Sequence, residues 1–117
     1  MSGKVKNFKE LEGCVVIYTD NYLNDIEGVK LEDECDVFLN RGRKKIVIDF
    51  ANTELVNSIG ISILVGIMEK VKKRNGILFF SSLKKVNHDI FNMLGLTKHI
   101  SIFQTEEEAI GKMLAHE

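Results

Sequence analysis

Residues 46–74 constrain the fold more than any other stretch, because they read as a buried strand, a polar loop and a long apolar helix in succession. Residues 46–50 (IVIDF) are apolar without alternation, which is typical of a strand covered on both faces of its sheet. Residues 51–57 have no apolar period and predict a loop. A strand that leads into a helix in this way is the repeating unit of α/β domains.

From Ile59 onward the apolar residues recur with the 3.6-residue period of a helix. The helix should end at Asn75-Gly76, after lysines that suit the negative end of its dipole. Its apolar residues form two neighbouring ridges: the first holds Ile61, Leu64, Val65, Met68 and Val71, and the second holds Ile59, Ile63 and Ile67. One ridge is enough to pack a helix on a sheet, so the second predicts a surface that a partner could cover.

Ser58 lies at or next to the N-cap of this helix. Unpaired backbone N–H groups and the positive end of the helix dipole meet there. A phosphate on Ser58 would be stabilised by that environment and would add about −1.5 to −2 charges. The simpler interpretation is that Asn57 or Ser58 only caps the helix, which contributes about 1 kcal/mol. The surplus apolar residues Ile59 and Ile63 beside the serine favour a docking surface instead.

The order of these elements resembles the STAS domain of bacterial anti-sigma factor antagonists. The resemblance runs over residues 5–114 and is carried by the segments IVIDF, VNSIGISIL, ILFFSS, FNMLGL and IFQTEEEAI. The motif serine of the family falls on Ser58 and its glycine on Gly60, whereas the family usually has aspartate at the position of Asn57. The resemblance implies one STAS domain over residues 1–117, an α/β fold with a mostly parallel central sheet of four or five strands and about four helices.

The resemblance also implies a function without catalysis. In this family an anti-sigma factor that is also a serine kinase phosphorylates the motif serine, which releases the complex, and a PP2C-type phosphatase restores binding. By analogy, this protein would bind such an anti-sigma factor, free the sigma factor, and be switched off by phosphorylation of Ser58. The residues expected to contact the partner are Asp20, Asn21, Tyr22, Glu54, Asn57, Ser58, Ile59, Gly60, Ser62 and Ile63. A variant of this role is a scaffold subunit of a larger signalling assembly, with a related STAS protein as its partner.

Bulk properties exclude several other classes of function. The 117 residues carry 16 Lys and Arg against 17 Asp and Glu, and a net charge of −1 gives no electrostatic basis for binding nucleic acid or an anionic membrane. The first residues lack the apolar core of a signal peptide, and the longest nearly apolar run, residues 59–68, is too short to span a bilayer. We therefore expect a cytoplasmic protein. The chain has no glycine-rich phosphate loop and no histidines at metal-ligand spacing, so we expect neither a cofactor nor a metal.

The rest of the chain continues the alternation of strands and helices, which predicts an α/β fold with a largely parallel sheet. Further strands are expected at residues 5–8, 14–18, 77–80 and 100–103, and the first of them at an antiparallel edge. Further helices are expected at residues 24–40, at residues 84–94, and from Thr105 onward. The helix at 84–94 should bury Val86, Ile90, Phe91 and Leu94, and the last helix Ala109, Ile110, Met113 and Leu114.

Right-handed crossovers place the loops that follow parallel strands on one side of the sheet. The loops at residues 20–22, 53–58 and 81–82 should therefore lie near one another, at the edge where α/β sheets usually bind ligands.

Asp49 offers a second interpretation, because response-regulator receivers carry a phosphoacceptor aspartate at the end of a central strand. Those domains also need an acidic pair after the first strand and a lysine late in the chain. Asp20 supplies at most half of that pair, and residues 102–105 (IFQT) lack the lysine. A structural role for Asp49, as a cap for the following loop, is therefore preferred.

Overall fold

A five-stranded sheet forms the centre of the computed structural model, which describes residues 7–116. The strands follow the order β1-β2-β4-β6-β7, with the bounds β1 (Phe8–Leu11), β2 (Cys14–Tyr18), β4 (Lys45–Asp49), β6 (Ile77–Ser81) and β7 (Ser101–Phe103). All neighbouring pairs are parallel except β1 and β2. The predicted α/β fold and its antiparallel edge strand are confirmed, but that strand spans residues 8–11 and overlaps the predicted range 5–8 only at Phe8; residues 5 and 6 of the prediction lie outside the described residues.

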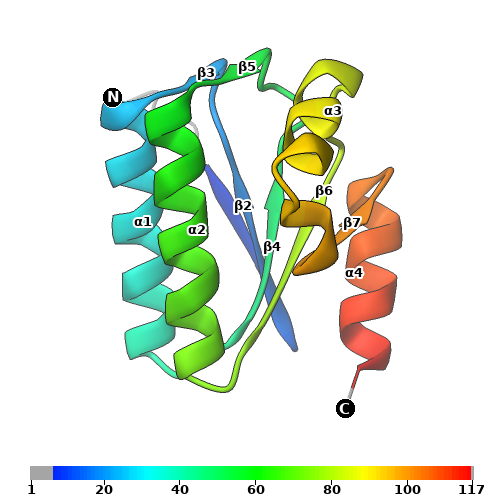
Figure 1. Cartoon of the computed structure of the whole chain (residues 1–117). Coiled ribbons are helices and arrows are strands. Elements are labelled where there is room, and N and C mark those ends of the chain that lie inside the picture. The colour runs from blue at the N-terminus through cyan, green and yellow to red at the C-terminus, as the bar shows by residue number, and fades with distance from the viewer. Residues whose placement is uncertain (1–6, 117) are drawn as a thin grey trace, which may run out of the picture.

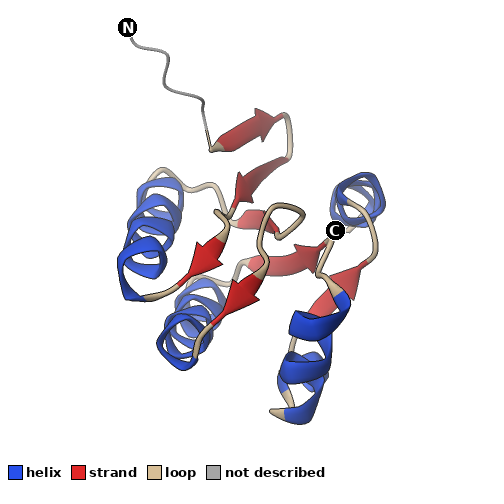
Figure 2. Ribbon diagram, turned by 90° about the horizontal axis from the view of Figure 1, so that it is seen from above, coloured by secondary structure: helices blue, strands red, loops and turns tan. Residues whose placement is uncertain are grey.

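Helices cover both faces of the sheet (Figures 1 and 2). Within residues 7–116 they are α1 (Asp25–Asn40), α2 (Ser58–Lys73), α3 (Lys85–Met93) and α4 (Glu106–Ala115), with a short 3₁₀ turn, η1 (Leu96–Lys98), after α3. Figure 2 shows α1, α2 and α3 on one face of the sheet and α4 on the other. In the described part of the chain, no helix combines the length and the apolar character that a membrane crossing needs.

Successive residues of the central strands pack into opposite halves of the core. Val15, Ile17, Ile46 and Ile48 belong to the cluster beneath α1, α2 and α3, whereas Val16 and its neighbour Val47 belong to the cluster beneath α4. These side chains are all fully buried. This two-sided burial explains why the strands read as continuous apolar runs instead of alternating ones.

The loops after β2 and β4 contain two short strands that the sequence did not indicate. β3 (Tyr22–Leu23) and β5 (Leu55–Val56) pair in parallel with each other and form a separate two-stranded sheet. Strands of two residues are too short to produce a periodic pattern. In Figure 1 the pair lies at the top of the molecule, next to the beginning of α2.

The starts of α1 and α4 are capped by side chains. The Asn24 side chain accepts a hydrogen bond from the backbone N–H of Glu27 at 3.0 Å, and the Thr105 hydroxyl accepts one from the backbone N–H of Glu108 at 3.0 Å. Each bond satisfies one of the donors that a helix start leaves unpaired, which contributes about 1 kcal/mol.

α2 packs side by side with α1, and this contact breaks up the expected second ridge. A Cβ atom on Gly28 of α1 would lie 2.5 Å from Cδ1 of Ile63, so Gly28 allows the two helices to approach closely. Ile63 is therefore half-buried, and Ile67 is fully buried in the core. Ile59 alone of the three stays exposed, at 50% of its surface.

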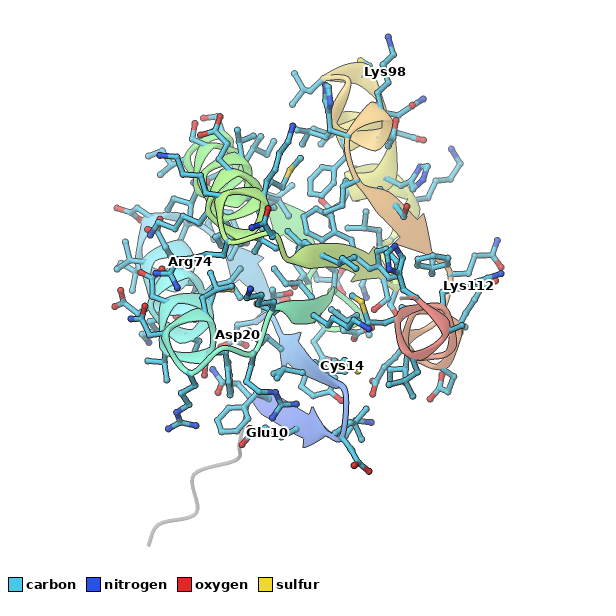
Figure 3. All side chains as sticks on the ribbon, turned by 90° about the horizontal axis from the view of Figure 1, so that it is seen from below. Glu10, Cys14, Asp20, Arg74, Lys98 and Lys112 are labelled. Atoms are coloured by element: carbon cyan, nitrogen blue, oxygen red, sulfur yellow. The ribbon has the colours of Figure 1, made fainter. Side chains whose placement is uncertain are left out.

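The C-terminal ends of α1 and α2 are joined through Arg74 (Figure 3). Its guanidinium donates hydrogen bonds to the carbonyl of Leu39 at 3.1 Å and to Oδ1 of Asn40 at 2.9 Å. The Leu39 carbonyl also accepts a hydrogen bond from the backbone N–H of Gly42 at 3.0 Å, so Arg74 is a second donor to this oxygen at the end of α1. Arg74 thus holds the ends of the two helices together over the sheet.

The inward face of α3 follows the prediction at Phe91 and at the partly buried Ile90, but not at its other two positions. Val86 and Leu94 are exposed, at 51% and 58%, whereas Asn87 and Phe91 are fully buried. The reason is that Phe91 anchors this nine-residue helix by packing edge-on against Phe50, with ring centroids 6.0 Å apart. The helix is thereby rotated away from the face that the positions of its aliphatic residues suggested.

α4 follows its predicted face except at its end. Ala109 and Met113 are fully buried against the sheet and Ile110 is partly buried, whereas Leu114 is 50% exposed. Leu114 lies over the turn between β1 and β2, where a Cβ atom on Gly13 would come within 2.9 Å of its Cδ2 atom. It is therefore covered on one side only.

We expect Phe91→Ala to lower the free energy of unfolding by about 3–5 kcal/mol. The change removes the ring that packs α3 on the sheet and leaves a cavity in the core. Val86→Ala on the same helix should change it by less than about 0.5 kcal/mol, because Val86 is exposed. Urea denaturation followed by circular dichroism measures both. Equal losses in the two variants would contradict the orientation of α3.

Candidate functional site

The first turn of α2 is capped by Asn57. Its Oδ1 atom accepts a hydrogen bond from the backbone N–H of Gly60 at 2.8 Å, and its carbonyl accepts one from the backbone N–H of Ile61 at 2.9 Å. Ser58 is the first residue of the helix and is exposed. Of the two capping residues that the sequence left open, the structure assigns the role to Asn57, so the Ser58 hydroxyl is not needed to cap the helix.

The same turn is pressed against β3 at Gly60. A Cβ atom on Gly60 would lie 2.4 Å from the carbonyl oxygen of Leu23 and 3.2 Å from Cγ1 of Val56. The backbone N–H of Asn57 donates to that same Leu23 carbonyl at 3.1 Å. Only a residue without a side chain fits here, so Gly60 fixes the distance between the helix start and the β3–β5 pair.

Hydrogen bonds join the loop after β2 to the loop after β4, as the crossovers predicted. The Thr53 hydroxyl donates to the Asp20 carbonyl at 2.6 Å, and the backbone N–H of Glu54 donates to the Asn21 carbonyl at 2.8 Å. Thr53 is fully buried and also hydrogen-bonds the hydroxyl of Thr19. The buried hydroxyls of Thr19 and Thr53 therefore hold the loop that leads to Ser58 in place.

The third loop, after β6, is attached through Asp49. The hydroxyls of Ser81 and Ser82 donate to its Oδ1 atom at 2.7 and 2.6 Å, and the backbone N–H of Ala51 donates to its Oδ2 atom at 3.2 Å. Asp49 is only 4% exposed. Its carboxylate is thus used as an acceptor that ties two loops together, which is the structural role preferred from the sequence.

α3 contributes a further support that sequence reasoning missed. The amide of Asn87, which is fully buried, donates to the carbonyls of Thr53 and Glu54 at 3.2 and 3.4 Å. Lys84 forms an ion pair with Glu54 at 2.8 Å. The sequence did contain a signal for this contact: Asn87 is a polar residue one helical turn before Phe91. Both residues lie on the buried face of α3.

Exposed apolar side chains lie near Ser58. Tyr22, Leu55 and Ile59 are exposed at 42%, 45% and 50%, and Tyr22 and Leu55 are paired neighbours in the β3–β5 sheet. The Tyr22 hydroxyl accepts a hydrogen bond from the Asn57 amide at 3.4 Å, which places it beside the start of α2. We call Tyr22, Leu55, Ser58 and Ile59 the Ser58 surface. Sequence reasoning missed Leu55, because it assigned residues 51–57 to a loop.

The remaining residues predicted to contact a partner lie around this surface with different exposures. Asp20, Asn21, Glu54 and Ser62 are exposed, Asn57 and Ile63 are half-buried, and Gly60 is buried. Gly60 can therefore act only by shaping the backbone, and Ile63 mainly packs against α1.

The electrostatic setting of Ser58 differs from that of the starts of α1 and α4. The first turns of α1 and α4 carry acidic side chains, Asp25 and Glu27 in one and Glu106 to Glu108 in the other, whereas the first turn of α2 carries none. The positive end of the α2 dipole is therefore not neutralised by a carboxylate of its own turn. Residues 7–116 contain no cluster of three or more side chains that could hold a metal ion.

Comparison with known proteins identifies the family. Residues 6–109 match the family model of the STAS domain. The chain belongs to the STAS domain family. A relative from Thermotoga neapolitana, described as a candidate anti-sigma factor antagonist and a homologue of TM1081, is 26% identical over 105 residues, covering 88% of this chain and 92% of the relative.

Solved structures of STAS proteins share the fold. The crystal structure of TM1081 from Thermotoga maritima, a candidate anti-sigma factor antagonist, superposes with a TM-score of 0.84 at 20% identity, covering 91% of this chain and 92% of that one. The phosphorylated form of SpoIIAA from Bacillus gives a TM-score of 0.72 at 20% identity, covering 90% and 96% of the two chains. These comparisons confirm a STAS fold with a mostly parallel five-stranded sheet and four helices in the described residues.

We expect Gly60→Ala to lower the free energy of unfolding by about 1–3 kcal/mol, because its methyl group would collide with the Leu23 carbonyl. Gly111→Ala is the matched control: it also lies in a helix, but nothing lies within 4 Å of the added atom. That change should stabilise the protein by about 0.5–1 kcal/mol. Thermal unfolding of both variants measures the difference, and a stabilised Gly60→Ala protein would disprove the close approach.

Proposed function

We propose that this STAS protein is an anti-sigma factor antagonist. In its unmodified form it binds an anti-sigma factor that is also a serine kinase, and so frees the sigma factor. Phosphorylation of Ser58 breaks the complex, and a PP2C-type phosphatase restores binding. The observation that carries this proposal is the exposed Ser58 hydroxyl on the first residue of α2, with exposed apolar side chains near it. The function described for its relatives supports the same assignment.

The switch follows from the different effects of phosphate on the free protein and on the complex. In the free protein, a phosphate on Ser58 sits at a helix start with unpaired N–H groups and no acidic neighbour in its turn, so the fold tolerates it. In the complex, the same dianion is pressed into an apolar contact and loses hydration. A thousandfold loss of affinity requires only about 4 kcal/mol, which burial of an unpaired dianion can supply.

The partner-binding surface in this proposal consists of the Ser58 surface and the polar loop residues around it. Tyr22, Leu55 and Ile59 supply apolar contacts, while Asp20, Asn21, Glu54 and Ser62 form a polar rim. Asn57 and Gly60 hold the first turn of α2 in place. The protein itself performs no chemistry in this scheme and acts in the cytoplasm without a cofactor.

The alternative of an aspartyl phosphoacceptor is disfavoured by the setting of Asp49. A phosphoacceptor must be reached by its phosphodonor, whereas Asp49 is 4% exposed and already accepts bonds from two serine hydroxyls. Ser58, in contrast, is exposed.

We expect Ser58→Asp to weaken binding to the cognate anti-sigma factor by about a hundredfold or more, which corresponds to about 3 kcal/mol, because it places a charge within the apolar contact. The fold should be unaffected, because Ser58 is exposed and an acidic residue suits a helix start. Isothermal titration calorimetry with each anti-sigma factor kinase of the host measures the affinity. Ser58→Ala, which cannot be phosphorylated, should bind like the parent protein and stay bound when ATP is added. Parent-like binding by Ser58→Asp would refute the switch.

Ile59→Glu should weaken the same complex by about tenfold or more, because it removes an apolar contact and adds a charge. Val37→Glu is the matched control, since Val37 is 48% exposed near the far end of α1. Both variants should unfold at nearly the parent temperature. If Val37→Glu weakens binding as much as Ile59→Glu does, the partner does not dock specifically on the Ser58 surface.

A further inference from the structure

The outward face of α1 carries a regular stripe of exposed side chains. Two of them are apolar, Ile26 and Val37, which are exposed at 63% and 48%. Two charged residues, Lys30 and Asp33, lie exposed between them. The successive members of this stripe are four, three and four residues apart, which is the spacing of the seam in a two-helix coiled coil. We call Ile26, Lys30, Asp33 and Val37 the α1 seam.

The other faces of α1 are already covered by the protein itself. Leu31, Cys35 and Phe38 are buried in the core, and Gly28 lies against Ile63 of α2. Figures 1 and 2 show α1 at the side of the molecule, next to α2 and away from α3 and α4. The α1 seam is therefore open to another molecule.

The charges next to the α1 seam are largely neutralised within the protein. Lys70 of α2 forms ion pairs with Glu32 at 3.0 Å and with Asp36 at 3.1 Å. Within residues 7–116, Asp33 forms no ion pair. The carboxylate of the α1 seam thus has no cation of its own, although the carboxylates on the side of α1 that faces α2 have one.

The order of residues in the α1 seam is complementary to its own reverse. If two copies of α1 run antiparallel, Ile26 of each copy lies opposite Val37 of the other. In the same register Lys30 of each copy lies opposite Asp33 of the other, because both pairs share a midpoint between residues 31 and 32. A parallel pairing would place like charges opposite each other, which costs free energy. The charges therefore select the antiparallel arrangement.

Lys30 is able to take this second partner. It forms an ion pair with Glu27 of its own helix at 3.3 Å, and 66% of the Lys30 side chain is exposed. Exposed pairs of this kind within a helix contribute little, so the lysine can turn to a carboxylate of another molecule at small cost.

We propose that the α1 seam binds a second copy of this chain in an antiparallel, twofold arrangement. Apolar contacts between Ile26 and Val37 close the two ends, and the ion pairs between Lys30 and Asp33 fix the register. The net charge of −1 adds little repulsion between copies. The α1 seam is only about 16 Å long at the rise of an α-helix, so the interface is small and belongs to the weak, transient class.

The contact leaves the Ser58 surface free. None of the four residues of the α1 seam belongs to that surface, and α1 and α2 begin at the same end of the molecule (Figure 1). An antiparallel pair therefore carries its two Ser58 surfaces at opposite ends. Val37→Glu should abolish the pairing of copies and keep the affinity for the anti-sigma factor, so this proposal and the proposed function fail separately.

The test is sedimentation equilibrium of the full-length protein from about 10 µM to about 1 mM. We expect a monomer–dimer equilibrium with a dissociation constant on the order of 100 µM. A protein that stays monomeric at the highest concentration overturns the proposal. Species larger than a dimer overturn it as well, because a twofold contact is closed.

Exchanged charges test the register. Lys30→Asp and Asp33→Lys each place like charges opposite each other and should weaken the pairing by about tenfold or more. Mixed in equal amounts, the two variants can form a heterodimer in which opposite charges meet again, and it should be as tight as the parent dimer. Lys112→Asp has the same net charge as Lys30→Asp but lies exposed on α4, so it should pair like the parent protein. A mixture that associates no better than either variant alone overturns the antiparallel register.

Ile26→Glu tests the apolar contact and should weaken the pairing by about tenfold or more. Leu94→Glu is the matched control, because Leu94 is 58% exposed at the end of α3 and lies outside the α1 seam. It should pair like the parent protein. Equal weakening in the two variants would show that copies associate through apolar surface in general, and that result would also overturn the proposal.

Discussion

The contact between Gly60 and the Leu23 carbonyl is the constraint on which the site depends. It lets the backbone of α2 touch β3, so the helix begins at the two-stranded β3–β5 sheet and not at some distance from it. The Asn57 cap then fixes the first turn, in which Ser58 is exposed. Exposure of that hydroxyl is therefore a result of backbone packing beneath it.

Much of the fold could be predicted because its determinants are local. The central strands are continuous apolar runs, and Asn24 and Thr105 mark helix starts by their side-chain chemistry. The faces of the helices were less predictable, since they depend on contacts between distant residues. α3 is rotated by the packing of Phe91 on Phe50, and Ile63 is covered by α1 because Gly28 leaves room for it.

The candidate site was predictable in its centre and not at its margins. Ser58 could be located because a helix start is visible in the sequence, and the loops around it because parallel strands end at one edge. Leu55 and Asn87 could not, because β5 is too short to show a pattern and Asn87 interrupts the apolar period of its helix. Their roles arise from tertiary contacts alone.

The buried amide of Asn87 connects α3 to the segment that precedes Ser58. Asn87 of α3 donates hydrogen bonds to the carbonyls of Thr53 and Glu54, and these bonds support that segment. Because α3 and this segment share these two hydrogen bonds, loss of the Asn87 amide would remove a contact from both of them. Val86 and Leu94 are exposed on the same helix, so a molecule that bound this side of α3 would be linked to the segment before Ser58 through Asn87.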